Sequence, residues 1–133
     1  MVLAVLGLLV ALAVPGYRSI VLRARAQEAR GALEEIADAE LRYFRDHGRF
    51  LACAPMPAGD PPRGTTALFD ARAPGWRELA FHMEGRVRYR YEVALDGKSF
   101  CAVARGDLNG DGKASTFTLR GDTMQLSVED ELE

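Results

Sequence analysis

The chain has 133 residues, two cysteines and a net charge of -2 at pH 7, with acidic and basic side chains interspersed after an apolar start. This charge balance excludes the strongly basic surface that is typical of general nucleic-acid-binding proteins. The length allows one modest domain, because a helical pattern takes up about 47 residues and roughly 86 remain for a compact core.

An uninterrupted apolar run opens the chain. No polar side chain occurs from Val2 to Val14, whereas Arg18, Arg23 and Arg25 follow shortly afterwards. At about 1.5 Å per residue, the first 14 or so residues would span roughly 21 Å, less than the hydrocarbon core of about 30 Å. We expect residues 1–25 to form an apolar helix for a membrane or a filament core, of which the beginning lies upstream of Met1.

The junction after this run contains helix-weakening residues. Pro15 removes a backbone donor and Gly16 has low helix propensity, so a kink or a locally melted segment is expected between Gly7 and Gly16. The alternative interpretation of the run is a cleaved signal peptide. Ala11 to Ala13 has the small-x-small form of a cleavage site, but no positively charged segment precedes the run.

An amphipathic helix is expected over residues 26–48. Apolar side chains recur every three or four positions from Leu22 to Phe44, as in a helix that covers a core with one face. Gly48 directly after His47 is typical of a helix C-terminus. The two helical parts together would be far longer than a usual globular helix, so one small core cannot bury both.

The remainder predicts a loop and then an antiparallel sheet. Residues 49–75 are rich in proline and glycine and are expected to form a long loop. Residues 76–133 contain short runs of alternating polarity, with Asp96-Gly97 as a hairpin signal. The fold class is therefore α+β, a long N-terminal helix packed on an antiparallel β-sheet. The expected strands lie at 79–84, 86–93, 100–104, 117–119 and 124–128.

The two cysteines suggest a disulfide bond. Cys53 and Cys101 are an even pair in a chain with an export-like N-terminus, and closing a loop of about 49 residues would contribute about 4 kcal/mol. The alternative is a pair of free thiols in a reducing compartment.

The segment between residues 107 and 115 follows the ligand spacing of a calcium loop. Asp107, Asn109 and Asp111 occupy the first, third and fifth positions, with the carbonyl of Lys113 at the seventh and Ser115 at the ninth. The bidentate glutamate of the twelfth position is missing, and a strand pattern follows in place of a helix. A calcium site is therefore weighed against a hairpin loop rich in Asn-Gly and Asp-Gly.

No catalytic motif is present, so the sequence predicts a non-enzyme. The two histidines have no zinc or triad pattern, His47 being expected at a helix end and His82 on a strand face. Trp76 is expected in the core. The alternating arginines at 86, 88 and 90 are expected on a solvated strand face, with phosphate or carboxylate binding as the alternative.

Several segments resemble the type IV pilins and the pseudopilins of type II secretion. They are MVLAVLGLLVALAVPGY at the start, LRYFRDHGRF near residue 47, and WRELAF, RYRYEV and FCAVARGDLNGDGKASTF in the sheet region. The resemblance implies a lollipop-shaped subunit whose first helix assembles with other copies in a filament. It also places Met1 about seven residues inside the mature chain of the family. The implied assembly-helix residues are Leu3, Leu6, Gly7, Leu9, Leu12, Pro15 and Tyr17.

The resemblance further implies a place and partners for the chain. The subunit would lie in the bacterial inner membrane before assembly and then in an extracellular or periplasmic filament with itself or related pilins. No small-molecule substrate is expected, and DNA or a surface ligand has no motif in its support. The alternative function is a membrane-anchored or secreted ligand-binding module with a calcium-stabilised loop.

Overall fold

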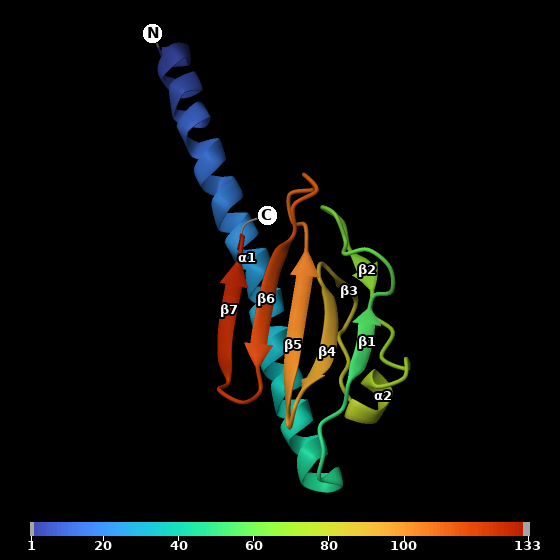
Figure 1. Cartoon of the computed structure of the whole chain (residues 1–133). Coiled ribbons are helices and arrows are strands. Elements are labelled where there is room, and N and C mark those ends of the chain that lie inside the picture. The colour runs from blue at the N-terminus through green and yellow to red at the C-terminus, as the bar shows by residue number, and fades with distance from the viewer. Residues whose placement is uncertain (1, 132–133) are drawn as a thin grey trace.

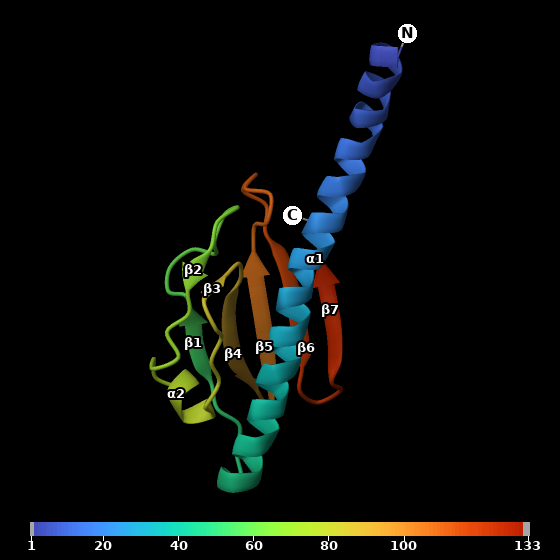
Figure 2. The ribbon, with the colours of Figure 1, turned by 180° about the vertical axis from the view of Figure 1, so that it is seen from behind.

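The computed structural model describes residues 2–131 and has one long helix standing against one main sheet (Figure 1). Helix α1 runs from Val2 to His47, and its first half extends beyond the sheet without any strand beside it. The second half crosses one face of the sheet (Figure 2). The α+β class and the helix-on-sheet arrangement predicted from the sequence are confirmed.

The main sheet has five antiparallel strands in the order β1-β4-β5-β6-β7. Strands β4 and β5 pair from Asp96 with Ser99, so the two-residue hairpin turn consists of Gly97 and Lys98, one residue after the predicted Asp96-Gly97. Strand β7 forms the edge opposite β1. The strands are β1 (Cys53–Met56), β4 (Arg90–Asp96), β5 (Ser99–Gly106), β6 (Ser115–Arg120) and β7 (Gln125–Glu129).

The core lies between the second half of α1 and the sheet. Small residues on the helix, including Ala26, Ala29 and Ala37, are fully buried and let the helix backbone approach strands β5 and β6 closely. Leu33 and Ile36 fill the space between them and are also inaccessible to solvent. Burying each such side chain contributes about 1.5–3 kcal/mol, so this helix face stabilises the head of residues 26–131.

The region between α1 and β4 differs from the prediction. The expected strand over 79–84 is wrong, because Trp76–Leu79 forms the short helix α2 and an irregular segment follows it. The backbone N–H of Gly75 donates to Glu78 Oε2 at 2.6 Å, which closes the first turn of α2. Phe69, Trp76 and Phe81 pack edge to face beneath this region, so aromatic packing and not strand pairing buries the alternating apolar residues.

The expected loop over 49–75 also contains pairing. Strand β1 lies within it at the sheet edge, and β2 (Ala67–Leu68) pairs with β3 (Arg86–Val87) in a separate two-stranded sheet. Proline is tolerated in β1 because an edge strand needs only one side of its backbone for pairing.

Helix α1 is continuous through its weak junction. The helical backbone includes Gly7, Pro15 and Gly16 without interruption, so the predicted melted segment is absent. The hydroxyl of Ser19 donates to the carbonyl oxygen of Gly16 at 2.9 Å, directly after the proline.

Candidate functional site

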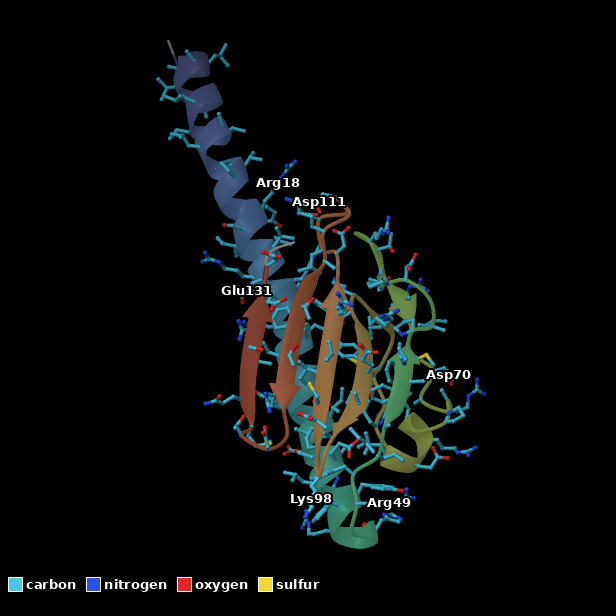
Figure 3. The ribbon with its side chains drawn as sticks, viewed as in Figure 1. Arg18, Arg49, Asp70, Lys98, Asp111 and Glu131 are labelled. Carbon is cyan, nitrogen blue, oxygen red and sulfur yellow. The ribbon has the colours of Figure 1, made fainter. Side chains whose placement is uncertain are left out.

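The first half of α1 is an apolar surface without a partner inside the described residues. Leu3 is 85% exposed and Leu12 is 69% exposed, although leucine in a folded domain normally avoids water. The other predicted assembly residues, Leu6, Gly7, Leu9, Pro15 and Tyr17, lie on the same exposed stretch. Figure 3 shows the side chains of this part of α1 projecting from the helix on several sides, with no strand beside them.

This stretch is long and apolar enough to anchor the chain in a membrane. By length and composition, an 18-residue stretch of α1 could cross a membrane, and none of this stretch is buried in the structure. Signal sequences share this length and composition. Exposing these apolar side chains to water is unfavourable. A contiguous apolar patch of this kind therefore marks an interaction site or a membrane contact.

Glu28 fastens α1 to the sheet just below the exposed half. Its carboxylate accepts hydrogen bonds from the backbone N–H of Arg88 at 2.8 Å and from the hydroxyl of Tyr91 at 3.1 Å. The Arg88 guanidinium lies 3.2 Å from the second carboxylate oxygen. Burial raises the pKa of Tyr91, and the negative charge of Glu28 raises it further. Sequence reasoning missed this connection, because it joins residues about 60 positions apart.

Glu40 is the most unusual charged group of the head. It is fully buried, one carboxylate oxygen accepts the backbone N–H of Leu51 at 3.0 Å, and the other oxygen has no partner among the described residues. Burial raises its pKa to about 7, although the Leu51 bond lowers it. The sequence contained a signal, because Glu40 occupies an apolar-stripe position, four residues after Ile36 and three before Tyr43.

The predicted calcium loop is held by hydrogen bonds from its own backbone N–H groups to the carboxylate of Asp107. Asp107 is only 3% exposed, and its carboxylate accepts backbone N–H groups from Gly110 at 2.6 Å, Asp111 at 3.2 Å and Gly112 at 2.7 Å. Three of roughly four lone-pair positions are thereby used. This network accounts for the loop without a metal ion.

The other predicted calcium ligands make hydrogen bonds with nearby backbone groups. The side chain of Asn109 accepts the N–H of Asp111 at 3.0 Å, and Asp111 accepts the N–H of Lys113 at 2.8 Å. Ser115 is buried at the start of β6 and donates to the carbonyl of Gly106 at 3.1 Å. Between residues 2 and 131, no group of three His, Cys, Asp or Glu side chains is placed to hold a metal. Calcium binding stays a prediction.

The predicted disulfide is wrong in this structure, where Cys53 and Cys101 are both free thiols. Cys53 pairs with Val93 of β4, and Val93 pairs with Ala102 of β5, so two strand spacings separate the cysteine-bearing strands. At about 4.8 Å per spacing, the Cα atoms lie beyond the roughly 7 Å that a disulfide bridges. Cys101 also points to the opposite face from Ala102.

The arginines at 86, 88 and 90 do not form a free row. Arg86 donates to the Thr66 hydroxyl at 2.8 Å, and Arg90 donates to the carbonyl oxygen of Gly59. With Arg88 held by Glu28, each arginine has a partner inside the chain. Arg86 is exposed on β3, Arg88 lies between the strands and Arg90 begins β4, so the three do not share one strand face as predicted.

The remaining single-residue predictions have mixed outcomes. Trp76 is fully buried, as predicted, and its indole N–H donates to the carbonyl of Ala54 at 2.8 Å. His47 ends α1 as predicted, with its ring stacked 4.0 Å from that of Tyr43. His82 lies in the irregular segment after α2 and not on a strand.

The fold is therefore that of an α+β protein in which the second part of helix α1 packs on the sheet and the first part is apolar and exposed. Comparison with known protein families, with curated proteins and with solved structures finds no match for this chain.

Proposed function

We propose that the chain is a structural subunit of a type IV pilus or a related secretion pseudopilus, which assembles by packing of its N-terminal helices. The observation that carries this proposal is the division of α1. From Ala26 to Tyr43 one face of the helix is buried against the sheet, whereas the part from Val2 to Tyr17, the apolar half, is exposed. A second copy of the same apolar half would cover this surface in a filament, and the bacterial inner membrane would cover it beforehand.

The proposed role needs no catalytic residue. Removing the apolar half from water supplies the driving force, since buried apolar area contributes about 25 cal/mol per Å². The head then faces outward from the filament. A helix that is one continuous rod suits this role, because it transmits the position of the filament core to the head without a flexible joint.

The test is filament formation by the full chain, observed by electron microscopy. The double variant Leu3→Asp/Leu9→Asp places two charges on the apolar half and should abolish filaments. The matched control is Leu68→Asp/Leu95→Asp, which makes the same change at head positions that are 65% and 53% exposed. Filaments that persist in the first variant, or vanish equally in both, would contradict assembly through the apolar half.

A further inference from the structure

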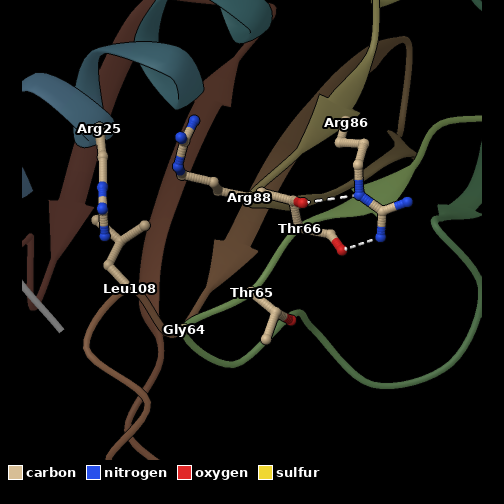
Figure 4. Close-up of a pocket in the computed structure, with 7 residues that line it drawn as sticks. All are labelled: Arg25, Gly64, Thr65, Thr66, Arg86, Arg88 and Leu108. Atoms are coloured by element: carbon tan, nitrogen blue, oxygen red, sulfur yellow. Dashed lines mark hydrogen bonds between the residues drawn. The ribbon is translucent and has the colours of Figure 1, made fainter.

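The end of the head from which the apolar half emerges contains a hollow lined by arginines. Its volume is about 390 Å³, within the range of about 300–1,000 Å³ that is usual for ligand pockets. Figure 4 shows Arg25 coming from α1 and Arg88 from the segment after β3, whereas Arg86, on β3, is turned toward Thr66. Thr65 and Thr66 line the same hollow and bring two hydroxyl groups.

The charge of this hollow is incompletely balanced. Glu28 pairs with Arg88, and among residues 2–131 Arg86 bonds only with the neutral hydroxyl and carbonyl of Thr66. Arg25 makes no hydrogen bond or ion pair with any other described residue, and its side chain is half-buried. Three guanidinium groups against one carboxylate leave an excess of positive charge inside a concave surface, which favours an anion.

A second hollow continues from the first toward the apolar half of α1. It has a volume of about 480 Å³ and shares Arg25 and Leu108 with the first hollow. Tyr17, Val21 and Leu22 give it an apolar wall along the helix. The two hollows together present a positively charged end and an end with an apolar helix wall, which also includes Arg18 and Asn109 in its lining. The second end lies on the side from which the exposed part of α1 leaves the head.

We propose that this pair of hollows binds an anionic phospholipid, with the headgroup phosphate among Arg25, Arg86 and Arg88 and an acyl chain along Tyr17, Val21 and Leu22. A guanidinium fork matches two phosphate oxygens, and a bound headgroup would hold the head against the membrane surface before assembly. The inference rests on the membrane-inserted form of the proposed function, but it does not depend on filament assembly.

The test uses the full chain in a neutral detergent and short-chain lipids as probes. Melting is followed through the fluorescence of the buried Trp76. Dihexanoyl phosphatidylglycerol at ten times its dissociation constant should raise the melting temperature by about 5 °C. Dihexanoyl phosphatidylcholine and inorganic phosphate at the same concentration should raise it far less.

The matched variants are Arg25→Gln and Arg23→Gln. Both remove one positive charge from α1, but Arg23 is exposed and does not line either hollow. The shift with phosphatidylglycerol should vanish in Arg25→Gln and persist in Arg23→Gln. Equal loss in both variants, persistence in both, or an equal shift with inorganic phosphate would overturn the lipid site. Flotation with phosphatidylcholine vesicles tests membrane insertion separately, so a failed lipid site leaves that part of the function standing.

Discussion

The two halves of α1 share one helical backbone but lie in opposite environments. In the head half, Ala26, Leu33 and Ile36 are inaccessible to solvent, whereas Leu3 and Leu9 in the apolar half are mostly exposed. Apolar composition alone therefore does not show which half belongs to a folded core. The spacing of the apolar residues does show it. A stripe of apolar residues on one helix face packs on a sheet, whereas a helix that is apolar all round packs in lipid or among other helices.

The largest expected effect is on the free energy of unfolding, when the same Leu→Asp substitution is made in each half of α1. Leu33→Asp places a charge in the fully buried core and should lower the free energy of unfolding by about 5 kcal/mol, which is comparable to the stability of a whole domain. Leu9→Asp should change head stability by less than about 0.5 kcal/mol, because Leu9 contacts no part of the head. Denaturant unfolding of the full chain in detergent, followed by Trp76 fluorescence, checks both values. Comparable losses would show that the apolar half contributes to the head.

The next largest effect is the pH dependence of stability that Glu40 gives to the head. Burial raises the pKa of Glu40 to about 7 from an ordinary value of 4.5, so the folded head prefers the protonated form. The stabilising contribution is complete below about pH 4.5 and is lost as the pH rises through 7. At about 1.36 kcal/mol per pKa unit, this loss amounts to about 3 kcal/mol.

Glu40→Gln removes the titration and keeps an oxygen that can accept the Leu51 N–H. The variant should be more stable than the unchanged chain at pH 8 by up to about 3 kcal/mol, and the two should converge toward pH 4.5. Glu35→Gln, on an exposed position of the same helix, is the control and should leave the pH dependence unchanged. A variant at residue 40 with an unchanged pH slope would place the titration elsewhere.

A smaller loss of stability is expected from a change in the loop between β5 and β6. Asp107→Ala leaves three backbone N–H groups without their carboxylate and should cost about 2 kcal/mol, even in the presence of a chelator. Thermal unfolding in a chelator measures this loss.

The calcium prediction requires an additional shift in the same loop. Excess calcium should raise the melting temperature of the unchanged chain, and Asp111→Ala should remove that rise. A melting temperature that is equal in calcium and in chelator would reject the calcium site, while the cost of Asp107→Ala would remain.

The parts of the fold that sequence predicted are those with local signals. Strands β4 and β5 follow from alternation and from the turn at Gly97, and α1 follows from its periodicity. Strand β1 falls in a predicted loop because Pro55 interrupts its pattern, and its pairing depends on β4, which is distant in the sequence. Residues 79–84 predict a strand because they alternate in polarity, but the burial of Phe81 arises from aromatic packing after α2.

The contacts that organise the candidate sites could not be predicted from local sequence patterns, because they join residues that are far apart in the chain. The bonds of Glu28 with Arg88 and Tyr91, and the hollow of Arg25 and Arg86, appear only once the sheet lies against the helix. Glu40 is the exception, because a carboxylate within an apolar stripe is visible in the sequence. A charged residue at a stripe position therefore identifies a buried titrating group better than a pattern of arginines identifies a binding surface.

The smallest expected effect is that of a reductant on the head. Cys53 and Cys101 are free and lie on opposite sheet faces, so dithiothreitol should shift the melting temperature by less than about 1 °C, whereas a disulfide over this loop would contribute about 4 kcal/mol. Burial raises the pKa of the Cys53 thiol to about 12, with the charges of Glu40 and Glu78 adding to it, and burial also raises that of Cys101. Both thiols therefore stay protonated and poorly nucleophilic at neutral pH. Alkylation followed by mass spectrometry should find two modified cysteines after denaturation without reductant. A single intramolecular bridge in that experiment would require β1 to leave its pairing with β4, which lies between β1 and β5, so that Cys53 could approach Cys101. It would show that the edge strand β1 is held less firmly than the half of α1 that packs on the sheet.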